Sequence, residues 1–423
     1  MQTMQTTPTT QTMQTLKLKR GEDRRLKAGH LWIFSNEVDT RATDFKNLVP
    51  GEEVLVRDSL GRVLGCATVN PHSLICARIH AHTARPLDED LLFERVEQAL
   101  NLRSSLFADP YYRLVYGEGD ALPGLVIDRF GSHLTVQITT LAMEQRKEAL
   151  RSVLHRLVKP ASILWDNTVA SRTLEGLTLG TECEGPVPDT LDVPENGCIC
   201  SVPLLEGQKT GWFFDQRPNR RLMELLARGR DVLDAFSYVG GFGVVAGHAG
   251  AASVTFADAS SRALGYARDN LARNAPGTAC TVLEGDAFDT LKALHEEGRR
   301  FAVVSIDPPA FIKRRKDYKE GLLAYRRINA LACALVEDGG YLLTSSCSQA
   351  LHVDDLRGCV AHACARQNLH PRLLHTGWQG PDHPIHCAMP ETAYLKCLLV
   401  QISRQPQPKH AAGQSREHLA GNA

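Results

Sequence analysis

The chain has 423 residues, of which 43% are hydrophobic and 23% charged. This composition is typical of a globular protein with more than one core, and excludes collagen-like, coiled-coil and disordered classes. Lys and Arg together number 48, as do Asp and Glu, so any binding of nucleic acid has to come from local basic patches. No apolar run reaches about 18 residues, which excludes a membrane-spanning helix.

The two ends of the chain are of low complexity. Residues 1–15 are rich in Gln, Thr and Met without the basic and apolar regions of a signal peptide, and residues 404–423 are rich in Gln, Pro, His and Gly. We therefore expect two disordered tails on a cytoplasmic protein. The twelve cysteines lack a metal-ligand spacing, which predicts buried thiols in a reducing compartment and no bound metal.

Residues 16–90 have the pattern of a small β-rich domain. Apolar and polar residues alternate over 51–57 and 63–69 around a Ser-Leu-Gly turn, and a further strand is predicted over 74–79. Apolar residues then recur at helical spacing from Leu92 to Leu100.

Residues 91–195 predict a small α+β domain. Two strands, near 125–128 and 134–139, join across Gly131 and Ser132. One amphipathic helix is predicted from Met143 to Leu157, ended by Pro160, and a strand follows over 163–165.

Residues 196–403 alternate short apolar strands with helices. Such alternation predicts an α/β fold, a Rossmann-like doubly wound parallel sheet. Helices are expected over 261–274 and 319–336, and the strands over 232–234, 254–256, 282–283, 302–306 and 341–344.

The first of these strands ends at Asp234 and leads to the pair Gly240-Gly241. A Gly-rich turn at this place brings backbone N–H groups close to a ligand. The turn lacks the GxGxxG spacing of a dinucleotide site, and an aspartate repels a pyrophosphate but attracts a cationic ammonium or sulfonium group. This argues against an NAD-dependent dehydrogenase.

Two more carboxylates follow at strand ends. Asp258 is placed to accept hydrogen bonds from ribose hydroxyls, and Asp286 from an adenine amino group. Either residue could instead cap a helix. Three acidic strand ends in order predict S-adenosylmethionine as the cofactor.

The fourth and fifth strands end in residues suited to catalysis. Asp307 stands before two prolines that stiffen its loop, and Cys347 precedes a helix expected to begin near Gln349, whose dipole would favour the thiolate. A thiolate that adds to C6 of a pyrimidine makes C5 nucleophilic enough to take a methyl group. Asp307 would bind the N3/N4 edge of cytosine.

Two basic clusters predict contact with RNA. Residues 16–30 contain six basic and two acidic residues, and residues 309–327 contain seven basic and two acidic residues. The second cluster directly follows the Asp307 loop, where a phosphate backbone would lie. The RNA-binding residues expected from the two clusters are Lys27, His30, Lys313, Arg314, Arg315 and Lys316.

Several motifs together resemble one family, the bacterial large-subunit ribosomal RNA cytosine-C5 methyltransferases of the RlmI type. They occupy residues 26–37, 116–125, 209–217, 236–242, 307–309, 346–348 and 390–392. The resemblance implies an N-terminal PUA RNA-binding domain over 16–90, a central α+β domain over 91–195, a methyltransferase domain over 196–403 and homodimers in some relatives. With the carboxylates above, it implies cofactor-binding residues Phe214, Asp215, Arg217, Asp234, Phe236, Ser237, Tyr238, Gly240, Asp258, Asp286, Ala287 and Asp307.

The function predicted from the sequence is S-adenosylmethionine-dependent methylation of cytosine C5 in 23S ribosomal RNA through an adduct between Cys347 and C6. The base that removes the C5 proton is unidentified, because the Asp307 loop contains no second cysteine. A uracil-C5 enzyme, a guanine-N7 enzyme and a non-catalytic RNA-binding protein are the alternatives.

Overall fold

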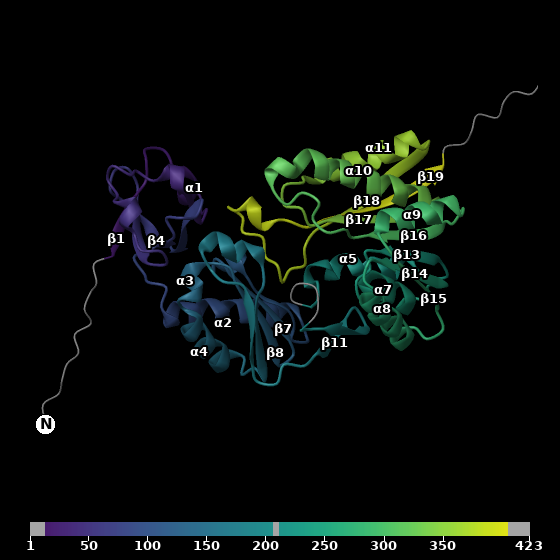
Figure 1. Ribbon diagram of the computed structural model, residues 1–423, viewed down its shortest axis with the longest axis horizontal. Helices are drawn as coiled ribbons and strands as arrows, with labels where there is room; N and C mark the ends of the chain where they lie inside the picture. The colour runs from purple at the N-terminus through teal and green to yellow at the C-terminus, as the bar shows by residue number, and fades with distance from the viewer. Residues whose placement is uncertain (1–12, 206–210, 405–423) are drawn as a thin grey trace, which may run out of the picture.

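The computed structural model describes residues 13–205 and 211–404, arranged as three sheet-centred parts in a row (Figure 1). The predicted disordered tails fall mostly outside these ranges. Where the structure describes them, the prediction is wrong: β1 (Gln14–Lys17) already pairs in a sheet, and Arg404 is the last residue of β19.

The first part is a five-stranded sheet in the order β1-β3-β4-β5-β2. Strand β1 is parallel to β3 and the other pairings are antiparallel. The three predicted strands are present, whereas β1 and β2 were not expected. The remaining elements are α1 (Arg24–Lys27), β2 (Trp32–Phe34), β3 (Glu53–Arg57), β4 (Val63–Val69) and β5 (Ile75–Ala81), with 3-10 turns η1 (Ser35–Glu37) and η2 (Phe45–Asn47).

The second part is a five-stranded sheet in the order β10-β9-β8-β7-β6. The single helix expected from Met143 to Leu157 is divided in two, because Arg146 leaves helical geometry and its guanidinium donates to the carbonyls of Leu87 and Ala142. The elements are α2 (Glu89–Leu106), β6 (Tyr111–Tyr116), η3 (Gly117–Asp120), β7 (Leu125–Phe130), β8 (His133–Ile138), α3 (Leu141–Glu144), α4 (Lys147–Leu157), β9 (Ser162–Asn167), η4 (Ala170–Glu175) and β10 (Gly180–Glu184).

A two-stranded hairpin, β11 (Thr190–Glu195) and β12 (Cys198–Pro203), connects the second part to the third. It lies across the boundary that the sequence places at residue 195.

The third part is a seven-stranded sheet in the order β15-β14-β13-β16-β17-β19-β18. Strands β13 to β17 are parallel, so their carboxyl ends meet at one edge, and β19 is antiparallel to both neighbours. The expected doubly wound sheet is confirmed. Its strands are β13 (Asp231–Ala235), β14 (Ser253–Asp258), β15 (Ala279–Glu284), β16 (Phe301–Ile306), β17 (Val336–Ser346), β18 (Leu369–Gly377) and β19 (Lys396–Arg404).

Helices cover both faces of this sheet (Figure 1). One apolar cluster joins α7 and α8 to the sheet, and a second joins α9, α10 and α11 to it. The helices are α5 (Arg217–Arg221), α6 (Met223–Leu226), α7 (Gly241–His248), α8 (Ser261–Asn274), α9 (Ala287–Glu296), α10 (Tyr318–Leu335) and α11 (Val353–Arg366), with 3-10 turns η5 (Phe214–Gln216), η6 (Arg315–Asp317) and η7 (Pro390–Thr392).

A long connection between β18 and β19 leaves the third part, and we call residues 378–395 the strap. The strap, yellow in Figure 1, crosses the second part and reaches the first. Met389 is fully buried in the apolar cluster of the first sheet, together with Leu26, Leu31 and Ile33. The strap therefore completes a core that lies more than 300 residues earlier in the chain.

Within the ranges described, no helix combines the length and apolar character needed to cross a membrane.

Candidate active site

The loop after β13 is held in an unusual backbone conformation. Phe236, Tyr238 and Gly240 have positive φ angles of 60°, 50° and 88°, a region that side chains other than glycine rarely adopt. A Cβ on Gly240 would lie 3.0 Å from the Cβ of Ala267, so this position has little room for a side chain. Such strain is typical of a ligand-binding loop.

Asp234, in β13, holds this loop in place by hydrogen bonds. Its buried carboxylate accepts hydrogen bonds from the Gly243 amide and the Ser305 hydroxyl, both at 2.8 Å. Burial raises the pKa of Asp234 to about 7. These contacts give Asp234 the role of holding the loop, so the geometry does not support the expected direct attraction of a sulfonium group.

Asp258 stands at the end of β14, half-buried, and accepts from the amides of Tyr238 at 2.9 Å and Ser260 at 3.0 Å. Asp286 is exposed and caps α9 by accepting from the Phe288 amide at 2.9 Å. The capping role left open by the sequence is thus confirmed for Asp286. Contact of either carboxylate with a cofactor stays a prediction.

A buried polar atom in the loop suits a ligand. The Ser237 hydroxyl oxygen is inaccessible to solvent and has no hydrogen-bond partner within the described chain. A buried hydroxyl without a partner is costly, and a polar ligand in the loop would supply one. Ala287, at the start of α9, is also buried.

The segment 214–217, where Phe214, Asp215 and Arg217 were also expected to bind the cofactor, contacts mainly the second part. Phe214 is buried against Phe130, with ring centres 5.2 Å apart. Arg217 donates to Glu195 at 3.1 Å and lies over the Phe107 ring. These side chains hold the parts together, and their contact with a cofactor remains a prediction. Residues 209 and 210 of the same motif lie outside the described residues.

The sequence missed Phe213, which lies edge-on to Tyr238 with ring centres 5.7 Å apart. The Tyr238 hydroxyl donates to the carbonyl of Gly211 at 3.2 Å. This aromatic pair attaches the 211–217 segment to the loop after β13.

Asp307 and Cys347 come from neighbouring strands. Ile306 and Thr344 are register partners of β16 and β17, so the Asp307 loop and the Cys347 loop leave the same edge of the sheet side by side. The Asp307 amide donates to the carbonyl of Ala235 at 3.4 Å, which connects it to the loop after β13. Cys347 is half-buried.

A buried hydroxyl network joins these two loops. The Tyr325 hydroxyl of α10 accepts from Ser346 at 2.8 Å and lies 2.9 Å from the Ser348 hydroxyl. Ser348 in turn accepts from the amide of Ile312 at 3.1 Å. Tyr325 thereby fixes the residues on both sides of Cys347, a role the sequence did not show.

The helix expected to begin near Gln349 begins at Val353. A turn over 349–351 intervenes, because His352 provides the cap of α11. The helix therefore begins six residues after Cys347, and the predicted helix start is wrong.

A lysine that the sequence also missed lies beside this loop. The Lys396 side chain is buried and donates to the carbonyls of Ser348 and Tyr394, both at 2.7 Å. Burial lowers the pKa of Lys396 to about 8, and the charge of Cys347 acts in the opposite direction.

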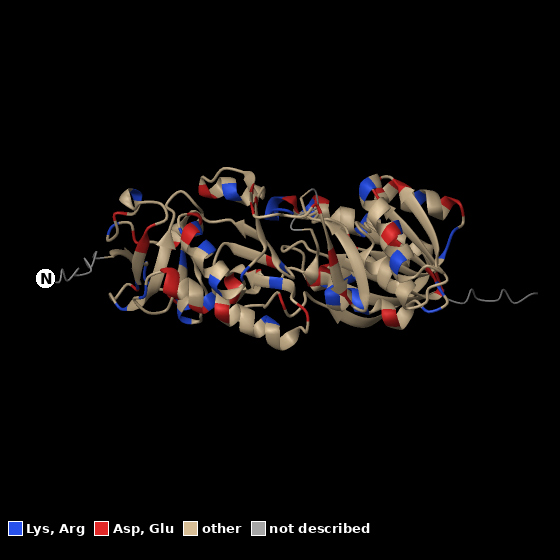
Figure 2. Cartoon of the chain, turned by 90° about the horizontal axis from the view of Figure 1, so that it is seen from below, with Lys and Arg blue, Asp and Glu red and all other residues tan. Residues whose placement is uncertain are grey.

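Residues 313–316, the basic segment after the Asp307 loop, are all exposed. Arg314 forms an ion pair with Asp317 at 3.4 Å. Figure 2 shows acidic and basic residues intermingled over the whole molecule, so this segment stands out by its place beside the site.

Two expected RNA contacts lie in the first part. Lys27 is exposed and paired with Asp23 and Asp58. His30 is buried, 4% exposed, and contacts Glu391 of the strap at 3.5 Å. Contact of His30 with RNA stays a prediction.

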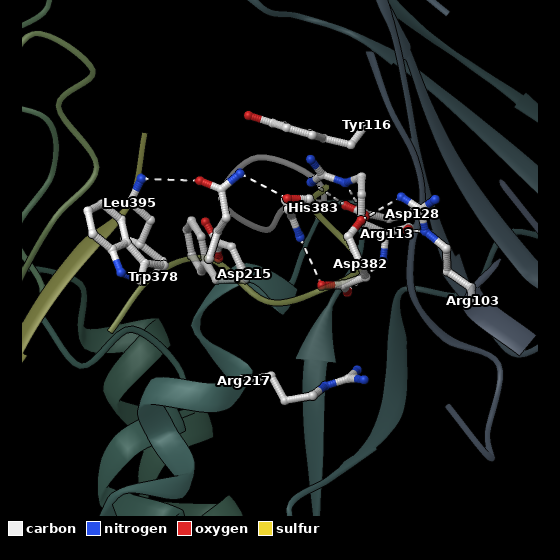
Figure 3. A network of polar contacts seen from close by, with 12 residues as sticks. Arg103, Arg113, Tyr116, Asp128, Asp215, Arg217, Trp378, Asp382, His383 and Leu395 are labelled. Carbon is white, nitrogen blue, oxygen red and sulfur yellow. Dashed lines mark hydrogen bonds and ion pairs between the residues drawn. The ribbon is translucent and has the colours of Figure 1, made fainter. Parts of the chain in front are cut away.

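The strap reaches the site and the other parts at once. Figure 3 shows Arg103 and Arg113 of the second part around Asp382 of the strap. Arg103 donates to the Asp382 carbonyl at 2.7 Å, and the Arg113 amide donates to its carboxylate at 3.1 Å. The Glu391 carbonyl accepts from Gln349, two residues after Cys347, at 2.7 Å.

Residues 13–205 and 211–404 contain no group of three or more His, Cys, Asp or Glu that could hold a metal ion.

Residues 16–81 match the PUA-like domain family, and residues 113–401 match the S-adenosylmethionine-dependent methyltransferase family. The ribosomal RNA large subunit methyltransferase I of Shewanella denitrificans is 33% identical over 394 residues, 92% of this chain and 99% of that protein. That of Yersinia pseudotuberculosis is 34% identical over the same shares.

Solved structures share the architecture. A putative S-adenosylmethionine-dependent methyltransferase from Streptococcus mutans superposes with a TM-score of 0.78 at 19% identity, over 92% of this chain and all of the other. A putative methyltransferase complexed with SAH gives 0.79 at 20% identity over the same shares. At these identities the likeness concerns the fold.

Proposed function

Because the chain belongs to the S-adenosylmethionine-dependent methyltransferase family, we propose that it methylates C5 of cytosine in 23S ribosomal RNA through a covalent adduct with Cys347. The observation that supports this chemistry best is the pairing of Asp307 and Cys347 at the ends of neighbouring strands, beside the strained loop after β13. A methyltransferase acting on an amino group has no use for the cysteine.

The residues present fit S-adenosylmethionine. Asp258 offers a half-buried carboxylate for ribose hydroxyls. The buried Ser237 hydroxyl has no hydrogen-bond partner within the described chain, and a polar group of the cofactor would provide one. When bound, the cofactor supplies an electrophilic methyl group. Tyr238 and Gly240 would form the wall of that site. Asp234 and Asp258 hold the backbone of this loop by accepting hydrogen bonds from its amides.

The chain's own residues then perform the following steps. The Cys347 thiolate forms a bond to C6, and the electron pair of the C5–C6 double bond becomes available at C5. Asp307 accepts a hydrogen bond from the cytosine amino group and holds the base in place. C5 takes the methyl group and loses its proton to a base, and the electron pair of the broken C5–H bond re-forms the double bond as sulfur leaves C6.

Asp307 also favours cytosine over uracil. A carboxylate accepts from the N4 amino group of cytosine, whereas uracil presents a carbonyl oxygen at that position and would face it with two acceptors. Guanine N7 methylation would leave Cys347 without a role, as would a non-catalytic RNA-binding protein.

An RNA substrate from the large ribosomal subunit is supported by the names of the relatives. The exposed basic segment 313–316 and the PUA-like part give two places for a phosphate backbone to lie. Such a substrate places the enzyme in the cytoplasm. A homodimer stays a prediction.

The test uses RNA that contains 5-fluorocytidine, because fluorine cannot leave C5 as a proton does. With S-adenosylmethionine present, the protein should form a denaturation-resistant adduct whose peptide maps to Cys347. Cys347→Ala should form none, while Cys280→Ala, which removes an exposed thiol elsewhere, should form it normally. An adduct with 5-fluorouridine RNA alone would assign the enzyme to uracil. An adduct at another cysteine would refute the mechanism.

A further inference from the structure

Lys396 is a buried cation whose hydrogen bonds do not neutralise it. It is the first residue of β19 and only 4% exposed. Its ammonium group donates to the carbonyl oxygens of Ser348 and Tyr394, at 2.7 Å each. Carbonyls satisfy donors but carry no net charge. A buried ammonium without a counter-charge is expensive, so packing alone does not explain this residue.

The strand register places Lys396 beside the residue that precedes Cys347. Lys396 is the cross-strand partner of that residue, Ser346. Its ammonium group donates to the carbonyl of Ser348, the residue after Cys347. The lysine thus spans the three residues at whose centre Cys347 stands. A negative charge on Cys347 raises the pKa of Lys396 against the effect of burial, which lowers it to about 8.

Resting on the function proposed above, we propose that Lys396 is the positioning residue that keeps Cys347 as a thiolate, through an ion pair between its ammonium group and the sulfur. When the pair forms beside the already protonated Lys396, the S–H bond breaks, its proton passes to solvent, and the electron pair stays on sulfur. Nothing is oxidised or reduced. The ammonium group remains while the sulfur is bonded to C6, and it is in place when the electron pair returns to sulfur.

Three other titratable groups of the described chain lie on elements beside this loop, Tyr325, Asp307 and Glu391, and none of them carries a positive charge. Tyr325 of α10 is buried, which raises its pKa, and a charge on Cys347 raises it further, so the phenol is neutral at neutral pH. Asp307, on the loop after β16, is acidic, as is Glu391 of the strap, whose backbone holds Gln349. Both disfavour a thiolate by repulsion. The lysine therefore supplies the attraction.

The experiment measures the rate at which iodoacetamide alkylates each cysteine as a function of pH, on the full chain without RNA or cofactor. Peptide mass spectrometry reads each site separately. Cys183 and Cys387 are exposed and serve as reference thiols in the same sample. In the parent protein, the midpoint for Cys347 should lie at least about one pH unit below those of the reference thiols.

Two substitutions separate charge from shape. Lys396→Met keeps the aliphatic stem and should raise the Cys347 midpoint by about one pH unit, a roughly tenfold slower alkylation at pH 7, with the reference thiols unchanged. Lys396→Arg keeps the positive charge and should leave the midpoint low. A purely structural lysine would alter rates without moving the midpoint.

The proposal is overturned if the parent midpoint equals those of the reference thiols, a result that needs no variant and stands even if Lys396→Met fails to fold. It is equally overturned if folded Lys396→Met keeps the parent midpoint. The proposed function fails separately: a low Cys347 midpoint with no trapped 5-fluorocytidine adduct would leave the ion pair standing and refute cytosine-C5 chemistry.

Discussion

Tyr325→Phe removes one oxygen atom from the network that joins the loops of Asp307 and Cys347. The hydroxyls of Ser346 and Ser348, 0% and 1% exposed, each contact that oxygen, at 2.8 and 2.9 Å. Each buried hydrogen bond contributes about 0.5–1.5 kcal/mol. The two together predict a loss of about 1–3 kcal/mol, because burial leaves no water to replace the phenol.

The loss is measured by urea unfolding followed by circular dichroism, with Tyr341→Phe as the matched control. Tyr341 lies in the same strand as Ser346, and its ring contact with Arg230 does not use the hydroxyl. In the methylation assay, Tyr325→Phe should lower kcat with little change in the KM for RNA, because misplaced reacting groups slow chemistry rather than binding. A stability loss below about 0.5 kcal/mol together with a normal kcat would refute the role assigned to this network.

Three further outcomes are expected. Asp258→Ala should weaken S-adenosylhomocysteine binding in calorimetry by about 1–3 kcal/mol, since ribose hydroxyls lose a half-buried acceptor; unchanged affinity would remove Asp258 from the site. Lys313→Ala with Lys316→Ala should reduce the salt slope of RNA binding by about 0.7 per lost phosphate contact, and an identical slope would show these residues to be solvated surface. The pKa of Asp234 is raised to about 7, so the folded state holds its proton more tightly than the unfolded state. Its contribution to stability should therefore be full near pH 4 and fall by up to about 1.4 kcal/mol per unit as the pH rises to 7; Asp234→Asn should remove that part of the slope in unfolding measurements at pH 5 and 7.

The sequence predicts well where local pattern decides. Helix α8 begins and ends at the predicted residues, Ser261 and Asn274, because a serine cap and a regular apolar face define it. The order of the parallel strands places Asp258, Asp307 and Cys347 at one edge without further information.

What the sequence does not predict depends on contacts between distant segments. The local sequence around His30 is that of an ordinary surface histidine. In the structure, however, His30 is buried and contacts Glu391, 361 residues away. Lys396 and Tyr325 come close to the Cys347 loop only because β19 and α10 pack against it. The start of α11 was misplaced because residues 349–351 form a turn, and the Asp355 carboxylate, which accepts from the His352 amide at 3.1 Å, fixes the helix start at Val353.

The burial of Met389 in the first part has a consequence for biosynthesis. Ala81, the last residue of β5, leaves the ribosome 308 residues before Met389. At about 5–20 residues per second, that interval is roughly 15–60 s. For this time the nascent PUA-like sheet lacks one side chain of its core, and the apolar surface around Leu31 and Ile33 is open to chaperones or to other chains. Complete folding of the part that is made first therefore waits until almost the whole polypeptide has been translated.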